Sequence, residues 1–172
     1  GFIDMKGNEV VAPIYREVGD FKNGLSKVTQ RDECRYRYGF VNKQGKEIIP
    51  CIYASCTRDE SNGNIFASEG YKTIMMDIKG NKLAEIDCSN IEPTGSGYSI
   101  IKKDLKYGII DESGKQVVEP IYERIIPAEG DVFIVQYDRL WGCIDTGGKK
   151  IIPIKYEEIK EYKNGLAYVK IN

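Results

Sequence analysis

The chain has 172 residues, of which 41% are hydrophobic and 30% are charged, a balance typical of a globular protein rather than a disordered one. Its formal net charge of −1 provides no broad field to attract nucleic acid or an anionic membrane, so we expect no nucleic-acid partner. No apolar run approaches the roughly 20 residues that span a bilayer, so no membrane insertion is expected either.

Histidine is absent, which removes the commonest general base and a frequent zinc ligand. The cysteines lack the two closely spaced pairs that a structural zinc site needs, and we interpret them as small core thiols. A disulfide between Cys51 and Cys56 is the alternative. The sequence therefore predicts no catalytic, cofactor-binding or metal-binding residue and no cofactor. The five cysteines are Cys34, Cys51, Cys56, Cys88 and Cys143.

The first predicted unit shows the pattern on which the rest of the chain is built. Asp4 is followed three places later by Gly7, a spacing that suits a type I turn ending in a left-handed residue. The aspartate side chain accepts backbone N–H groups in such a turn, and glycine takes a positive φ without steric cost. Pro13 then either ends the second strand or keeps it at the edge of a sheet, and Tyr15 follows. The pattern predicts strand, tight turn and strand.

The next two units repeat this pattern with different fidelity. In the second unit, "GFVN-KQG-KEII" again predicts strand, turn and strand. The third is worn: its aromatic, first glycine, proline and tyrosine are replaced, yet Asp77 and Gly80 remain. Either this copy has drifted or it is specialised as a contact surface.

The last two units are the closest pair, since "YGIIDESGKQVVEPIYERI" at 107 is echoed by "WGCIDTGGKKIIPIKYEEI" at 141. The segment "IIKKDLKYGII" predicts a further hairpin, and Asn164-Gly165 predicts a turn before a final strand. One such unit is too small to bury a core alone, so neighbouring copies are expected to stack. The predicted unit boundaries are 1–37, 38–72, 73–106, 107–140 and 141–172.

The predicted fold is all-β: tandem repeats of about 34 residues, each a three- to four-stranded antiparallel unit, stacked as an open twisted array. A small closed ring resembling a β-propeller is the alternative, although its blades usually need about 40 residues or more. We expect a single repeat domain over 1–172. Because Gly1 begins in the middle of a motif, we also expect a fragment of a longer protein.

The pattern aromatic-Gly-x-Ile-Asp-x-x-Gly-Lys-x-Ile-Ile-Pro-x-x-Tyr, followed by Asn-Gly-Leu-Ala-x-Val, resembles the bacterial WG repeat, also called the KWG repeat. The resemblance covers nearly the whole chain and is weakest over 73–106. The tryptophan that names the family is kept only at Trp141, with tyrosine at positions 38 and 107. The resemblance implies a binding or scaffolding array of uncharacterised function and supplies no catalytic residues.

The expected function is therefore a non-catalytic scaffold that mediates protein–protein interaction, with another protein as partner. The alternative is a carbohydrate- or cell-envelope-binding module that uses exposed tyrosines, with polysaccharide as partner. Tyrosines recurring fifteen places after each unit's aromatic are interpreted as a buried seam between units. Tyrosines outside this register are the predicted partner-binding residues: Tyr36, Tyr71, Tyr98, Tyr137 and Tyr162.

Overall fold

The computed structural model describes residues 1–171, and its regular elements there are all strands. The chain forms two compact units, residues 1–86 and 87–172, called here the N-terminal and C-terminal units. The strands that begin in the N-terminal unit are β1 (Phe2–Ile3), β2 (Glu9–Val11), β3 (Glu17–Val18), β4 (Leu25–Asp32), β5 (Arg35–Asn42), β6 (Glu47–Tyr53), β7 (Ser55–Arg58), β8 (Ile65–Glu69), β9 (Lys72–Met76) and β10 (Lys82–Asp87). Those of the C-terminal unit are β11 (Asn90–Pro93), β12 (Tyr98–Lys103), β13 (Lys106–Asp111), β14 (Gln116–Tyr122), β15 (Arg124–Ala128), β16 (Val132–Tyr137), β17 (Leu140–Asp145), β18 (Lys150–Tyr156), β19 (Glu158–Lys163) and β20 (Leu166–Lys170).

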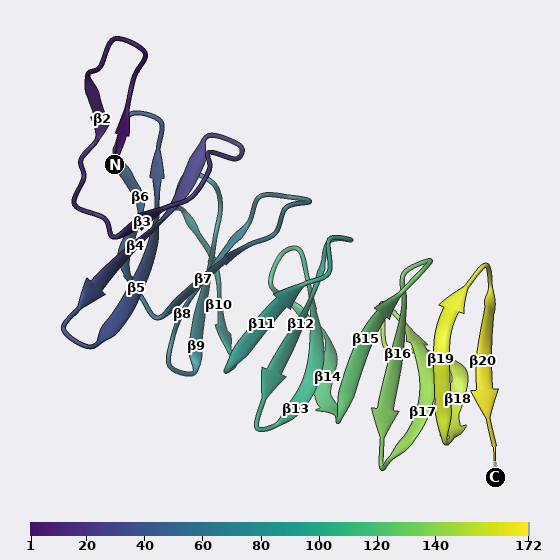
Figure 1. The fold of residues 1–172 in the computed structure, drawn as a ribbon. Coiled ribbons are helices and arrows are strands. Elements are labelled where there is room, and N and C mark those ends of the chain that lie inside the picture. The colour runs from purple at the N-terminus through teal and green to yellow at the C-terminus, as the bar shows by residue number, and fades with distance from the viewer. Residues whose placement is uncertain (172) are drawn as a thin grey trace. The chain divides into compact units, whose positions relative to one another are not determined.

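Consecutive strands pair into small antiparallel sheets, as Figure 1 shows. The N-terminal unit holds the two-stranded sheet β1-β2 and the four-stranded sheets β3-β4-β5-β6 and β7-β8-β9-β10. The C-terminal unit holds β11-β12-β13-β14, β15-β16-β17-β18 and the two-stranded sheet β19-β20. No sheet among the described residues closes into a barrel. The predicted all-β fold of repeated antiparallel units is confirmed, with four strands as the full complement.

The sheets are out of phase with the repeats of the sequence. The sheet β3-β4-β5-β6 takes its first two strands from the unit 1–37 and its last from the next unit, while β5 spans the boundary between them. In those last two strands, the aromatic that begins the unit lies directly opposite the tyrosine fifteen places later, as in Tyr38↔Tyr53, Tyr107↔Tyr122 and Trp141↔Tyr156. Each sequence unit therefore joins two neighbouring sheets rather than forming one.

The glycine after each aromatic is required by a close approach of the backbone. Between Tyr38 and Phe40 the pairing of β5 with β6 shifts register, so that the proline segment of β6 bulges over Gly39. A Cβ on Gly39 would lie 2.5 Å from the carbonyl oxygen of Ile49, and one on Gly108 would lie 2.6 Å from that of Val118. No side chain fits at those distances, so the conformation of the hairpin fixes this glycine.

The predicted Asp–Gly turns are confirmed in all five copies. In the first, the Oδ1 atom of Asp4 accepts the backbone N–H groups of Lys6 and Asn8, both at 2.8 Å, and the N–H of Gly7 donates to the Asp4 carbonyl. The side-chain hydrogen bond from Asn8, with these backbone bonds, holds the pKa of Asp4 below its usual value. The same backbone bonds are made by Asn42, Asp77, Asp111 and Asp145.

The core lies between consecutive sheets within each unit. In the N-terminal unit, Val11, Val28 and Val41 pack together between β1-β2 and the next sheet. In the C-terminal unit, Ile109 and Phe133 belong to one cluster shared by the two four-stranded sheets. Every tyrosine of the predicted seam contacts one of these clusters, which agrees with its structural interpretation. These tyrosines are Tyr15, Tyr53, Tyr122 and Tyr156.

The worn unit still contributes a complete pair of strands. Thr73 stands where the other copies have their aromatic; it is fully buried, and its hydroxyl lies 2.7 Å from that of Ser68. Met75 and Met76 are also buried. A small hydroxyl pair and flexible apolar side chains thus replace the aromatic contact while the turn at Asp77 is kept.

Candidate functional site

The hairpin β4–β5 departs from the repeat. Each of its strands has eight residues, whereas the corresponding strands β12 and β13 have six. The two extra cross-strand pairs are Arg31↔Tyr36 and Asp32↔Arg35, and all four of these side chains are exposed. These four residues account for the greater length of the first sequence unit. The extension, residues 31–36, is called here the long hairpin tip.

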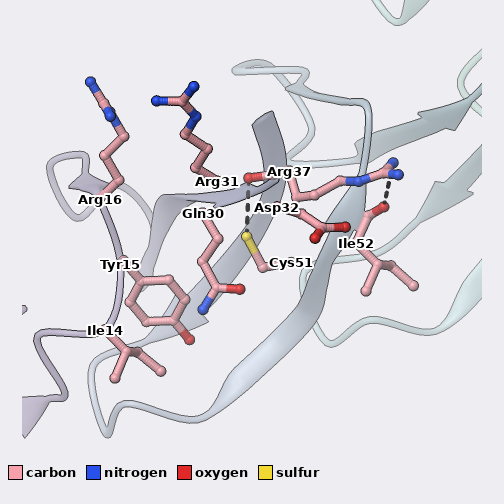
Figure 2. Close-up of a pocket in the computed structure, with 9 residues that line it drawn as sticks. All are labelled: Ile14, Tyr15, Arg16, Gln30, Arg31, Asp32, Arg37, Cys51 and Ile52. Carbon is pink, nitrogen blue, oxygen red and sulfur yellow. Dashed lines mark hydrogen bonds between the residues drawn. The ribbon is translucent and has the colours of Figure 1, made fainter. Parts of the chain in front are cut away.

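A hollow of about 730 Å³ lies beside the long hairpin tip. Figure 2 shows that its wall combines the segment before β3, the ends of β4 and β5, and the bulged part of β6. These segments are distant in the sequence and meet because β4 is the neighbour of both β3 and β5. The residues of the wall include Ile14, Arg16, Arg31, Asp32, Arg37 and Ile52.

Arg37 is fixed in place by the fold. Its Nη1 atom donates to the Ile52 carbonyl at 3.1 Å and to Oε2 of Glu69 at 2.8 Å. The same Glu69 oxygen accepts the N–H of Ala54 at 3.0 Å. The side-chain hydrogen bond from Arg37 holds the pKa of Glu69 below its usual value, although burial opposes this. Arg37 thus ties the base of the hairpin to the next sheet.

Two further arginines of the hollow are less constrained. The guanidinium of Arg16 lies over the ring of Tyr36, 5.4 Å from its centroid, and its Nε is 4.0 Å from a carboxylate oxygen of Glu17. Arg31 is exposed and makes no ion pair within residues 1–171. In Figure 2 the side chains of Arg16, from the segment just before β3, and Arg31, from β4, extend in the same direction. Three arginines therefore face one carboxylate, Asp32, around the hollow.

The titratable groups deeper in the hollow stay neutral near pH 7. The Cys51 Sγ donates to the Arg37 carbonyl at 3.1 Å, and burial raises the pKa of this thiol. The hydroxyl of Tyr15 donates to Glu47 Oε1 at 2.8 Å; burial, followed by this bond to a carboxylate, strongly raises the pKa of Tyr15. The arrangement can bind anionic and hydrogen-bonding groups, but these two side chains supply no nucleophile or base.

The five tyrosines predicted from the sequence occupy different environments. Tyr36, Tyr71 and Tyr137 are 43%, 76% and 49% exposed, and the ring of Tyr36 contacts Arg16, one of the residues that line the hollow. Tyr98 packs edge-on against Phe133 with ring centroids 6.3 Å apart. Tyr162 packs on the core cluster beneath β19-β20. Their role in partner binding stays a prediction.

The arginines of the hollow were missed by reasoning from the sequence. Four of the chain's seven arginines lie between residues 16 and 37, in the unit that is longer than the others. These two signals together point to the long hairpin tip. The sequence gives no sign that Ile14 and Ile52 contribute to the wall of the hollow, because this depends on which strands are neighbours in the sheet.

Elsewhere in the described part of the chain the chemistry is mainly structural. No group of three or more His, Cys, Asp or Glu side chains among residues 1–171 is arranged to hold a metal ion. None of the five cysteines forms a disulfide, and only Cys34, in the long hairpin tip, is exposed. Burial raises the pKa of Cys56 to about 12 and that of Cys143 to about 11. Within the described residues there is no helix long and apolar enough to cross a membrane.

Comparison with known proteins identifies the repeat. The family model described as WG containing repeat matches residues 1–34, 38–72, 107–141 and 141–172. No curated protein matches the chain. Eight chains of solved structures match, among them one from the crystal structure of a nidogen/laminin complex. It shares 13% sequence identity, covers 91% of this chain and 72% of that chain, and has a TM-score of 0.41, a similarity that carries no argument about function.

Proposed function

This chain belongs to the WG-containing repeat family, and we propose that it is a non-catalytic scaffold whose long hairpin tip and adjoining hollow bind an acidic segment of another protein. The observation that carries the proposal is the extension of one hairpin beyond the length that the repeat requires. The shorter hairpin β12–β13 shows that the sheet forms without the two extra pairs. The extension adds exposed charged and aromatic side chains rather than core.

The chemistry of the hollow supports an anionic partner. Guanidinium groups bind carboxylates through paired, charge-assisted hydrogen bonds, and Arg16 and Arg31 are available for this because neither is held by a buried partner. Ile14 and Ile52 are 65% and 59% exposed and offer apolar contact on the same wall. An extended segment that alternates acidic and aliphatic side chains satisfies both features.

The non-catalytic part of the proposal is supported by the roles that polar groups already play. The aspartates of four units and Asn42 of the second accept backbone N–H groups in turns, so their positions follow from the fold. The thiols of Cys56 and Cys143 remain protonated at neutral pH. Membership of a repeat family points in the same direction.

The test is a binding titration followed by fluorescence anisotropy. The probe is a labelled peptide that alternates glutamate and isoleucine, and its matched control carries lysine in place of glutamate. We expect the acidic peptide to bind and the basic control peptide not to bind. The charge reversals Arg16→Glu and Arg31→Glu should each weaken binding of the acidic peptide by roughly tenfold, because each replaces an attraction to the peptide's carboxylates with a repulsion. Arg124→Glu, an exposed arginine of the C-terminal unit, is the control and should leave binding unchanged.

Equal binding of the acidic and basic peptides, or an equal loss in all three arginine variants, would contradict the proposal. The carbohydrate alternative is examined in the same assay with purified envelope polysaccharides. Retention of a polysaccharide that is competed by its free sugar and lost in Tyr71→Ala and Tyr137→Ala would favour that alternative, because these rings are exposed at hairpin ends.

A further inference from the structure

A second hollow, with a volume of about 350 Å³, lies in the N-terminal unit beside the strands β4, β5 and β7. Its wall comes from the segment between β3 and β4, from β4 and β5 themselves, and from β7 with the residues that follow it. None of its residues belongs to the wall of the hollow beside the long hairpin tip. It is called here the second hollow, and what it binds is independent of the function proposed above. The residues of its wall include Asp20, Lys22, Lys27, Phe40, Arg58 and Glu60.

Arg58 is the buried cation of this wall. Its side chain is only 6% exposed, and its Nη1 atom donates to the Lys22 carbonyl at 2.7 Å. Its Nη2 atom lies 3.2 Å from each carboxylate oxygen of Glu60. The buried Nε–H has no acceptor among the residues that the structure describes. An unpaired donor on a buried charged group is unfavourable, so an oxygen atom that accepts from Nε would be stabilised there.

Glu60 is a poorly matched partner for this guanidinium. The strongest carboxylate–guanidinium pairs use two parallel hydrogen bonds with N···O distances of about 2.7–2.9 Å. Here both oxygens share the single Nη2 atom at 3.2 Å, and Nε is left out. The Glu60 side chain is 60% exposed, and its other ionic neighbour is the exposed Lys22, 3.6 Å away. Glu60 can therefore turn toward solvent at little cost and leave Arg58 to another carboxylate.

Lys27 brings a second cation to the wall. Its Nζ atom donates to the Cys56 carbonyl at 2.6 Å and lies 4.6 Å from the centroid of the Tyr38 ring. An ammonium group has three N–H donors, so Lys27 retains donors for a ligand oxygen. The net charge of the wall is +1, which one monovalent anion balances. The charged side chains counted here are Asp20, Lys22, Lys27, Arg58 and Glu60.

We propose that the second hollow binds a small carboxylic acid with a short aliphatic group, whose carboxylate pairs with Nε and Nη2 of Arg58 in place of Glu60. The volume is at the small end of the range of about 300–1,000 Å³ that is usual for small-molecule sites. The wall also includes the apolar side chains of Leu25 and Phe40, each 4% exposed, beside which the aliphatic group would lie. Glu60 is then an internal competitor that holds the site until the acid arrives.

The test is a titration with butyrate followed by nuclear magnetic resonance, in a buffer free of other carboxylates and of phosphate. The Nε–H signal of Arg58, identified by its absence from the variant Arg58→Lys, reports directly on the unpaired donor. We expect this signal and the backbone amide signal of Thr57, another residue of the wall, to shift together along one saturable curve. The Nε–H signal of Arg124, an exposed residue of the C-terminal unit, is the control and should not move.

Two substitutions should change the affinity in opposite directions. Glu60→Gln replaces the competing carboxylate with a neutral amide, whose hydrogen bond to Arg58 is weaker, so butyrate should bind roughly fivefold more tightly. Arg58→Lys keeps the charge but removes the paired donors, so binding followed at the Thr57 amide should weaken by roughly tenfold. Glu92→Gln, which removes an exposed carboxylate of β11, is the matched control and should leave the affinity unchanged.

The gain expected from Glu60→Gln keeps the proposal falsifiable even if Arg58→Lys loses its fold, which circular dichroism would show. A response of the Arg58 signal that does not saturate, or a Glu60→Gln chain that binds butyrate no better than the unmodified chain, would overturn the proposal. Chloride or inorganic phosphate shifting the same signals with equal or higher affinity would overturn the preference for a carboxylate.

The two sites of the N-terminal unit are separated by the same variants. Arg16→Glu and Arg31→Glu, which lie outside the second hollow, should leave the butyrate titration of the Arg58 signal unchanged. Glu60→Gln should leave binding of the acidic peptide unchanged. Failure of either site therefore does not imply failure of the other, whereas a loss of butyrate binding in Arg31→Glu would contradict a separate site.

Discussion

The hairpins β4–β5 and β12–β13 occupy equivalent places in their sheets and differ only at the end away from the Asp–Gly turn. Below that end the pairing is the same, with Tyr38 opposite Tyr53 in one sheet and Tyr107 opposite Tyr122 in the other. Beyond it, β4–β5 adds two exposed pairs, whereas β12–β13 closes at once through Asp104 and Leu105. The comparison shows which part of the repeat the fold requires and which part is free to acquire a function.

The largest loss of stability is expected from replacing a glycine that both hairpins share. Gly39→Ala and Gly108→Ala should each lower the free energy of unfolding by about 3 kcal/mol, because the new Cβ overlaps a backbone carbonyl oxygen in both sheets. Urea denaturation followed by circular dichroism gives the measurement. Gly130→Ala is the control: nothing lies within 4 Å of its Cβ, and its φ of 76° should cost only about 1 kcal/mol. Equal losses at the three glycines would contradict the close-approach explanation.

The next largest effect is a loss of binding, expected when the long hairpin tip, where the two hairpins differ, is shortened. Deleting Arg31, Asp32, Arg35 and Tyr36 together would give β4–β5 the length of β12–β13. We expect the midpoint of urea unfolding to change little, because all four side chains are exposed. Binding of the acidic peptide should weaken by roughly tenfold or more, about 1.4 kcal/mol, since Arg31 is removed from the wall of the hollow and Tyr36 no longer supports Arg16. A large loss of stability with unchanged binding would assign the tip to the fold instead.

The tight turn of β12–β13 provides a third, smaller test. Asp104 and Leu105 both have positive φ, 47° and 66°, a conformation that costs a residue with a Cβ about 1 kcal/mol or more. Leu105→Gly should therefore stabilise the C-terminal unit by about 1 kcal/mol, measured as a shift in the urea midpoint. Leu105→Ala is the matched control, because it removes an exposed side chain but keeps the Cβ and should give little gain. A gain of the same size in both variants would mean that the side chain, not the backbone, is unfavourable.

The features shared by the two hairpins are those that the sequence predicts. The Asp–Gly turns and the seam of tyrosines recur at fixed spacing, and each position has one chemical reason to be conserved among the copies. The phase of the sheets is not encoded in this local way, because each four-stranded sheet joins the end of one unit to the start of the next, and the repeat alone does not specify that pairing. The hollow is even harder to predict from the sequence, because Arg16 and Ile52 become neighbours only after β3, β4, β5 and β6 have assembled.

The smallest effect is expected from the ion pairs at the bases of these hairpins. The pKa of Glu69 is lowered chiefly by the side-chain hydrogen bond from Arg37, and that of Glu123 chiefly by the backbone N–H of Arg139. A carboxylate whose pKa is lower in the folded state contributes stability that is present above its unfolded pKa of about 4.3 and is lost as the pH falls through the folded value. Glu69 is exposed and the side chain of Glu123 is about one-third exposed (36%), so solvent screening keeps each contribution small.

Glu69→Gln and Glu123→Gln should therefore each reduce the loss of stability between pH 7 and pH 3, measured as the difference between urea midpoints at the two values. Glu92→Gln, an exposed residue of β11, is the control and should leave that difference unchanged. If Glu69→Gln also weakens binding of the acidic peptide at pH 7, Arg37 needs its carboxylate partner to hold the wall of the hollow. If binding strengthens instead, the freed guanidinium of Arg37 joins Arg16 and Arg31 in contacting the peptide.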